Sequence, residues 1–355
     1  MSPFRSTLAR SVGKLLGVYR ERDSSLRGFT QDSRISVPPQ LTLTGGTTVE
    51  YGGSRYHIFR TSTPGPMSYI TIDQVSNEPT ENVVDFLVIG GGGGAGGGDN
   101  AYGGGGGAGG LIWRPAKPIS STGGPYSVSI GSGGAGTPVD NSNVGNGING
   151  GDTTIGSSPD PIYFIAKGGG GGAIASGFSF GTNGSPGGSG GGGAGGGPGP
   201  KPGGSATQPS QPGDSGTYAH SGSGGSSGGG GGGGSGNGGN GPGSGGAGAN
   251  GYTVPEPFLP PGIPAPMATE ISPITTPSPE FRIFGGGGAG NSAATGGTGG
   301  GGDGFNSDGL SSAPAASYGI DGRGAGGGSG TSNNPRAYAG DGGDGIVIIR
   351  YDYTA

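Results

Sequence analysis

Hydrophobic residues near the N-terminus follow the period of an α-helix. Between residues 3 and 20 they recur at intervals of three and four, while arginine and lysine occupy positions around the rest of the helix. This spacing predicts a basic, amphipathic helix whose hydrophobic face consists of Phe4, Leu8, Val12, Leu15, Leu16 and Tyr19. Gly13 and Gly17 weaken such a helix in isolation, so we expect it to dock on another protein.

Two other interpretations of this N-terminal segment stay open. An organellar transit peptide is also rich in arginine and serine and has few acidic residues at its start. A basic amphipathic helix can also lie on a membrane surface. Residues 1–35 carry seven Lys/Arg against three Asp/Glu, although the whole chain has a net charge of −5. We therefore expect the two ends of the chain to face different partners.

Residues 36–89 have the pattern of short β-strands. Alternating or β-branched runs are separated by breaks that contain glycine or proline, and this predicts a small β module. The predicted strands are residues 41–43, 47–51, 55–60, 69–75 and 83–89.

Beyond residue 90, runs of glycine alternate with short hydrophobic segments typical of strands. These segments are residues 111–113, 126–130, 162–166 and 281–284. The chain then ends in a β-branched run, Ile346-Val347-Ile348-Ile349-Arg350-Tyr351. We expect this run to pair with residues 83–89 and to close the domain.

The 100 glycines among 355 residues far exceed the usual share of roughly 7%. Such a composition is typical of flexible linkers, and collagen requires glycine at every third position, which residues 168–174 do not maintain. An ordered alternative is polyglycine II, an extended helix with three residues per turn. Such helices can hydrogen-bond to their neighbours, because glycine lets backbones approach closely.

The predicted fold is therefore mainly β and irregular, with an N-terminal amphipathic helix, a small β module and a lattice of packed polyglycine II helices closed by a C-terminal strand. We expect three regions, residues 1–35, 36–89 and 90–355. The largest loops of the third region are residues 198–221 and 252–279. Loops on a rigid scaffold usually carry binding functions.

Composition argues against several classes of function. The chain has no cysteine, which excludes disulfides and thiolate metal sites. No apolar run reaches the roughly 18 residues that a membrane span needs, so no membrane insertion is expected. Only His57 and His220 supply imidazole groups, and we expect no enzyme activity, cofactor or metal. His57 is most simply a strand residue, and His220 is most simply a solvated loop residue.

Two glycine motifs have simpler interpretations than ligand binding. Gly91-x-Gly93-x-x-Gly96 formally matches the dinucleotide fingerprint, but that fingerprint needs a helix at its glycines, which this sequence does not provide. Asp303, Asp321 and Asp344 precede glycine as in calcium turns, yet they lack the full repeat register and are interpreted as turn residues.

Aromatic residues are frequent in and beside the loops. They suit stacking on sugars or packing in a receptor groove, and they equally suit capping the glycine lattice against water; both interpretations stay open. The candidate receptor-contact residues are Tyr218, His220, Tyr252, Phe258, Phe305, Tyr318 and Tyr338. Binding of nucleic acid is not expected, because the glycine-rich part is acidic.

Several segments together resemble a known family. They are Tyr56–Phe59, Asp85–Ile89 running into Gly90–Ala95, Gly106–Leu111, Tyr126–Gly131 and Gly343–Tyr351. Their order resembles the glycine-rich domain of bacteriophage tail-fibre and adhesin proteins, over about residues 47–355. The resemblance implies a sandwich of polyglycine helices whose loops contact the host surface. The basic N-terminal segment is similar to the leading segments of structural proteins in marine, cyanobacterium-infecting phages.

The resemblance thus implies a virion protein, a tail fibre or adhesin on the tail or capsid surface. It would dock on other virion proteins through residues 1–35 and present loops to a host cell-surface molecule. A homo-oligomer, with a trimer as the form usual for fibres, is expected. The alternative is a structural appendage or decoration protein of the virion that binds no receptor. A matrix-like glycine-rich protein would need a signal peptide, and Met1–Arg20 has no continuous apolar region.

Overall fold

The computed structural model describes most of the chain from residue 39 onward. The described residues are 39–61, 68–99, 101–137, 145–176, 180–196, 199–208, 219–224, 228–241, 245–256, 258–260, 282–290, 294–307, 317–332 and 339–353. The chain divides into two units, Met1–Pro39 and Gln40–Ala355. The predicted N-terminal helix, with Phe4, Leu8, Val12, Leu15, Leu16 and Tyr19, lies outside the described residues.

The unit that begins at residue 40 is mainly β, and its described residues contain no α-helix; η3 (Pro79–Glu81) is a 3-10 turn. The first sheet has the order β1-β4-β8-β9-β10 and the second has the order β2-β3-β17-β5-β7. The strands of the first sheet are β1 (Thr42–Thr44), β4 (Ser68–Gln74), β8 (Gly123–Ser129), β9 (Thr153–Ile155) and β10 (Phe164–Ala166). Those of the second are β2 (Thr47–Tyr51), β3 (Ser54–Phe59), β17 (Ile346–Asp352), β5 (Val83–Ile89) and β7 (Leu111–Pro118).

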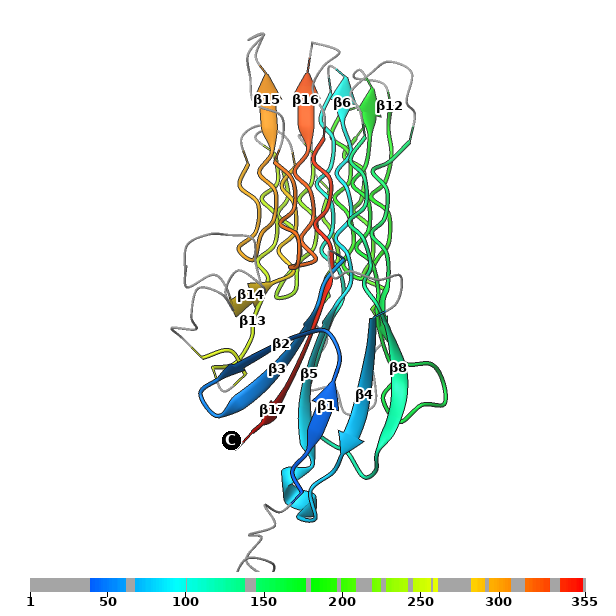
Figure 1. The fold of residues 1–355 in the computed structure, drawn as a ribbon. Coiled ribbons are helices and arrows are strands. Elements are labelled where there is room, and N and C mark those ends of the chain that lie inside the picture. The colour runs from blue at the N-terminus through cyan, green and yellow to red at the C-terminus, as the bar shows by residue number, and fades with distance from the viewer. Residues whose placement is uncertain are drawn as a thin grey trace, which may run out of the picture. The chain divides into compact units, whose positions relative to one another are not determined.

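Two smaller groups of strands accompany these sheets. A third sheet, called the distal sheet below, has the order β12-β11-β6-β16-β15, and β13 pairs with β14 alone. The strands are β12 (Phe180–Gly181), β11 (Ala175–Ser176), β6 (Gly98–Asp99), β16 (Gly330–Ser332), β15 (Phe305–Ser307), β13 (Tyr252–Thr253) and β14 (Ile283–Phe284). Within the unit, the distal sheet and the two large sheets lie at opposite ends of the glycine segments (Figure 1).

The last strand closes the second sheet. β17 lies between β3 and β5 and runs antiparallel to both, with Ile346 opposite Ile89 and Val347 opposite Phe59. The predicted pairing of the C-terminal run with residues 83–89 is therefore confirmed. The strands before residue 90 share their sheets with β7 to β10 and β17, so the β module predicted for residues 36–89 is only part of these sheets.

The two large sheets pack face to face around the main hydrophobic core. Phe86 of the second sheet and Phe164 of the first have ring centroids 5.1 Å apart, and both side chains are buried. Alternate residues of β17, Val347 and Ile349, point into this core. The residues between them, such as Ile348, belong to a second core on the opposite face of the same sheet.

The second core is covered by a segment far away in sequence. Val254, Phe258, Leu259 and Phe284 lie over the outer face of the second sheet. Because both faces of β17 are buried, this strand needs a continuous β-branched run rather than an alternation of apolar and polar residues.

The glycine segments hydrogen-bond with a period of three residues. Along residues 90–97, successive N–H groups donate to three neighbouring segments in rotation, over 2.8–3.0 Å. These acceptor segments are residues 104–110, 148–151 and 340–343. The carbonyl groups accept from three further segments, residues 134–137, 169–172 and 327–329. Residues 90–97 therefore have six hydrogen-bonded neighbours, whereas a strand in a sheet pairs with two at most.

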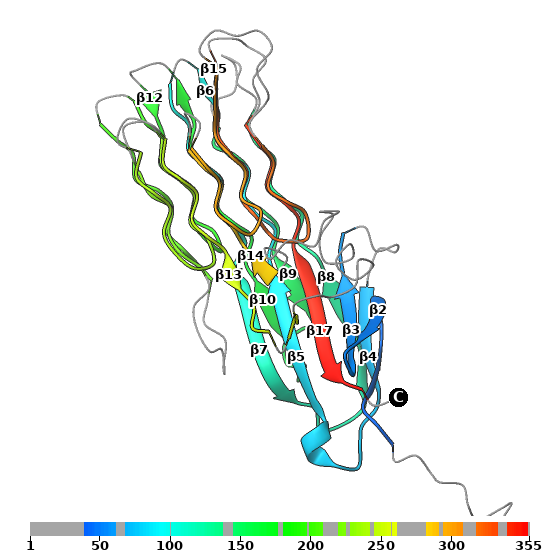
Figure 2. The ribbon, with the colours of Figure 1, turned by 90° about the vertical axis from the view of Figure 1, so that its left-hand side faces the viewer.

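Residues 103–110 repeat this arrangement. They donate to residues 167–173, 229–232 and 324–327, and they accept from residues 90–96, 189–192 and 288. Figure 2 shows the glycine segments as layers of wavy chains that run between the distal sheet and the two large sheets. All residues of both central segments, 90–97 and 103–110, are buried.

Close backbone contact explains why the central positions are glycine. A Cβ atom at Gly93 would lie 2.2 Å from the carbonyl oxygen of Gly170, and one at Gly106 would lie 2.0 Å from that of Gly93. Neither distance is compatible with a side chain unless the backbone moves.

Candidate functional site

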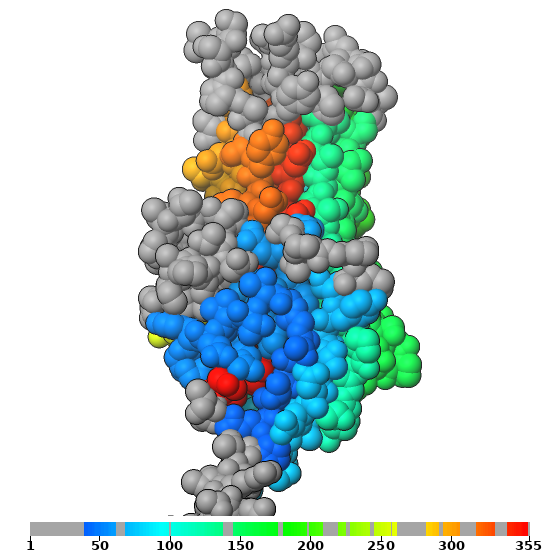
Figure 3. Space-filling model, in the orientation of Figure 1, coloured from blue at the N-terminus to red at the C-terminus, as the bar shows by residue number. Residues whose placement is uncertain are grey.

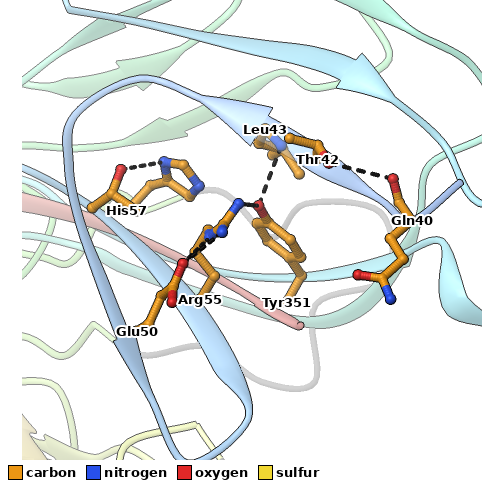
Figure 4. Close-up of polar contacts among 8 residues, drawn as sticks. Gln40, Thr42, Leu43, Glu50, Arg55, His57 and Tyr351 are labelled. Atoms are coloured by element: carbon orange, nitrogen blue, oxygen red, sulfur yellow. Dashed lines mark hydrogen bonds and ion pairs between the residues drawn. The ribbon is translucent and has the colours of Figure 1, made fainter. Parts of the chain in front are cut away.

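A polar cluster joins four strands at one edge of the two large sheets (Figure 4). The Tyr351 hydroxyl accepts hydrogen bonds from the backbone N–H of Leu43 (3.3 Å) and from Arg55 (3.5 Å). Arg55 also donates to Glu50 through two nitrogens, at 2.9 and 2.5 Å, and its guanidinium lies 3.7 Å from the centre of the Tyr353 ring. The cluster links β1, β2, β3 and β17, so it has a clear role in holding the sheets together.

His57 lies inside this region, on β3, as a buried residue. Its Nδ1 is 2.7 Å from the carbonyl oxygen of Gly45, and because a carbonyl only accepts, Nδ1 carries the hydrogen. The ring stacks on Tyr351 with centroids 5.8 Å apart, and among the described residues Nε2 has no hydrogen-bond partner. Burial lowers the pKa of His57. A neutral, packed imidazole of this kind matches the prediction that His57 is a strand residue.

The part of the chain that the structure describes contains no group of three or more His, Asp or Glu side chains that could hold a metal ion. Across the same residues, no helix has the length and apolar character needed to cross a membrane.

The hydrogen-bonded glycine segments between the distal sheet and the two large sheets, called the glycine body below, carry an open groove of about 490 Å³. It lies where three glycine segments, residues 131–137, 317–321 and 339–345, run side by side. Gly342 N donates to Gly134 O and Gly319 N donates to Asp341 O, both over 2.8 Å. The groove is lined by Gly133, Ala135, Tyr318, Gly319, Asp321, Asp341, Gly342 and Asp344. We call it the Tyr318 groove.

Each aspartate of the Tyr318 groove is held by backbone amides. Asp341 accepts a hydrogen bond from Gly136 N (2.7 Å), and Asp344 accepts one from Gly133 N (2.8 Å). Asp321 accepts from the backbone N–H of Asp344 (3.1 Å). Asp321 begins a turn, as predicted, whereas Asp344 lies in an extended segment just before β17.

The predicted receptor-contact residues fall in different environments. Tyr318 is 59% exposed and lines the groove, while His220 and Phe305 are half-buried. Tyr252 is half-buried against the second core. Tyr218 and Tyr338 lie outside the described residues.

The prediction that Phe258 is a receptor-contact residue is corrected by its burial. Its side chain is only 1% exposed, and its ring lies 4.6 Å from that of Trp113, edge to face. Tyr56 also donates its hydroxyl hydrogen to the Phe258 carbonyl over 3.0 Å. The outer face of the second sheet is apolar and has to be covered, so Phe258 belongs to the core and not to a receptor-contact surface.

A ladder of polar side chains along the edge of the glycine segments was not predicted from the sequence. Asn146, Asn149 and Asp152 recur every third residue. Their side-chain oxygens accept hydrogen bonds from the amides of Ile174 (3.3 Å), Gly171 (2.8 Å) and Gly168 (2.9 Å). Asp341 and Asp344 have the same spacing and the same role. A three-residue period of Asn and Asp beside glycine was the signal available in the sequence.

Comparison with known proteins shows the family to which the chain belongs. A family model described as a glycine-rich domain matches residues 71–352, so the chain belongs to that glycine-rich domain family. A search of curated proteins found no match for the chain.

Proposed function

We propose that the protein is a structural protein of a bacteriophage virion, a tail fibre or adhesin. In this proposal residues 1–35 dock on other virion proteins of the tail or capsid, and the glycine body presents loops to a host cell-surface molecule. Membership of the glycine-rich domain family and the resemblance to phage tail-fibre and adhesin sequences support it. Assembly as a homo-oligomer, as a trimer in the usual manner of fibres, is part of the same proposal.

We further propose that the glycine body is a polyglycine II lattice. The rotation of hydrogen bonds through three directions and the six neighbours of residues 90–97 support this assignment. None of the described glycines of residues 90–97 and 103–110 has a positive φ angle, which agrees with the left-handed form of the helix. Such a lattice is a stiff scaffold, because each central segment is tied to its neighbours in every lateral direction.

The single observation that carries the adhesin proposal is the distal sheet. Its five strands come from four separate parts of the chain, since β11 and β12 follow each other directly, and they meet at the end of the glycine segments away from the two large sheets (Figures 1 and 2). Aromatic residues occupy both edge strands, since Phe180 on β12 is 44% exposed and Phe305 lies on β15. A rigid scaffold that holds a composite surface at one end suits recognition of another molecule.

The second candidate is a virion appendage or decoration protein that binds no receptor. It is favoured by the environments of Phe258 and Tyr252, which pack on the second core. Those two aromatic residues serve stability, as the capping interpretation of the aromatics expects.

Loop exchange distinguishes the two candidates. Residues 177–179 and 308–316, which adjoin the edge strands of the distal sheet in the sequence, would be replaced together with residues 209–218 and 261–279 by the corresponding segments of a phage with another host. β13 and Phe258 stay in place so that the second core remains intact. The adhesin proposal expects a change in host range with normal assembly of particles, and the appendage proposal expects no change. Deletion of residues 1–35 provides the complementary test, because it should leave a folded protein that no longer joins particles.

A further inference from the structure

We propose that the Tyr318 groove binds a neutral carbohydrate. The inference rests on the proposed adhesin function and adds to it a binding site and a class of ligand. The segments that form the groove, coloured orange to red and green, come together on the face of the glycine body turned toward the viewer in Figure 3.

The groove has the size and rigidity of a binding site for a small ligand. Its volume of about 490 Å³ lies within the roughly 300–1,000 Å³ typical of such sites. Its walls are backbone segments of the glycine body, and their amides are hydrogen-bonded to neighbouring segments. A ligand therefore meets a preformed surface, which limits the entropy lost on binding.

Tyr318 supplies the apolar contact that a sugar needs. At 59% it is, with Ile148, among the most exposed large hydrophobic side chains of the described residues. An exposed ring of this size beside a groove offers a flat face for the C–H groups of a pyranose, while its hydroxyl remains available for hydrogen bonding. Burial against the lattice does not explain this position, in contrast to Phe258.

The aspartates supply fixed hydrogen-bond acceptors. The backbone amides of Gly136 and Gly133 orient the carboxylates of Asp341 and Asp344, and the Thr61 hydroxyl donates to the second oxygen of Asp344. Hydrogen bonds to an ionised carboxylate are stronger than neutral ones. The carboxylates line the groove without converging as a metal site would require among the described residues. Acceptors that are spread along a groove suit a ligand with several separate hydroxyl donors.

The negative charge of the Tyr318 groove favours neutral over anionic carbohydrates. The described residues that line the groove include three aspartates and no lysine, arginine or histidine. Sulfated, phosphorylated or sialylated glycans would be repelled by the carboxylates, so the ligand class is the neutral glycans.

The test uses the full-length protein on a glycan array that carries neutral, amino-bearing, sulfated and sialylated oligosaccharides. The strongest neutral binder is then titrated by calorimetry against the wild type and four variants. Tyr318→Ala removes the ring, Tyr318→Trp keeps an aromatic face, and Asp341→Asn keeps the acceptor for Gly136 N while removing the charge. Tyr163→Ala is the matched control, because Tyr163 is 37% exposed and lies outside the groove.

We expect Tyr318→Ala to weaken the binding of a neutral glycan at least about tenfold and Asp341→Asn to weaken it severalfold, while Tyr318→Trp and Tyr163→Ala stay close to wild type. Unchanged denaturation midpoints confirm that the variants are folded. The proposal is overturned if no neutral glycan binds, if Tyr318→Ala binds as well as wild type, or if only amino-bearing glycans bind. Adsorption of the same variants to host cells separates the two proposals. If wild type and Tyr318→Ala bind cells equally, the groove assignment fails and the adhesin function stands.

Discussion

Arg350 and Asp85 lie directly opposite each other in the pairing of β17 with β5, and their side chains form an ion pair with a nitrogen–oxygen distance of 2.8 Å. Both side chains are 18% exposed. Burial lowers the pKa of Arg350, but the hydrogen bond to Asp85 and the charge of Asp352 outweigh this effect and raise it. Asp85 also accepts a hydrogen bond from Ala116 N (2.8 Å), so this carboxylate ties the closing strand and β7 to β5.

Replacing Asp85 by alanine should destabilise the protein by about 1.5–3 kcal/mol, because a mostly buried guanidinium loses the less exposed of its two charged partners and keeps only Asp352, which is 79% exposed. Fluorescence of the single tryptophan, Trp113, which is buried in the second core, can follow denaturant unfolding. Glu256→Ala is the control, since Glu256 forms a surface ion pair with Arg282 (3.0 Å) and is 67% exposed. That change should cost at most about 0.5 kcal/mol. Equal effects of the two substitutions would contradict the role given to Asp85.

Alanine should be poorly tolerated at the centre of the glycine body. In Gly93→Ala the new Cβ would meet the Gly170 carbonyl oxygen at 2.2 Å, so neighbouring segments have to separate. Overpacking of a core costs about 1–3 kcal/mol, and more where only backbone can yield; we expect the upper end of this range or more, measured by denaturant unfolding. Gly145→Ala is the matched control, because no atom of the described residues lies within 4 Å of its added Cβ and its φ is not positive. It should be neutral or stabilise by about 0.4–1 kcal/mol.

Acid should destabilise the sheets through His57. Its pKa is lowered in the folded state, so the unfolded state binds more protons as the pH falls through the usual value of about 6.5. The destabilisation is absent above that pH and grows as the pH decreases toward the folded-state pKa. Denaturation midpoints at pH 7.5 and pH 5 should therefore differ less in His57→Gln than in wild type. The carboxylates contribute equally to both proteins, so an identical difference in the two would rule out His57 as the source.

The polar ladder at the lattice edge should protect individual amides. Asn149→Ala removes the acceptor for Gly171 N, which should cost about 0.5–1.5 kcal/mol and accelerate hydrogen exchange in peptides that contain Gly171. Asn149→Asp retains the acceptor oxygen and should keep the slow exchange, although it loses the hydrogen bond from Nδ2 to Pro186 O (3.0 Å). Fast exchange in both variants, or in neither, would show that the side-chain oxygen is not what protects Gly171.

Local patterns in the sequence predicted the larger strands and the closing pair. The β-branched run that begins at Ile346 pairs with the run that ends at Ile89, as expected from the two β-branched runs. The three-residue period of the hydrogen bonds along the glycine segments was also expected, because glycine lets extended backbones approach each other closely. These features depend on neighbouring residues, which the sequence displays directly.

The sequence did not predict which of the two large sheets each strand joins. Adjacent runs such as β3 and β4 join different sheets, because that choice depends on which apolar faces meet after folding. Phe258 was assigned to a loop surface for the same reason, since its partner Trp113 is far away along the chain. The Tyr318 groove joins residues near positions 133, 318 and 341, and only the packing of the glycine segments brings them together.

The most direct test of the proposed function is the binding of fluorescently labelled full-length protein to cells of candidate cyanobacterial hosts, combined with competition against adsorption of the phage that carries it. The adhesin account predicts saturable binding that reduces phage adsorption in proportion to occupancy. If the folded protein neither binds nor competes, even when it is presented multivalently, the account is contradicted and the structural-appendage alternative takes its place.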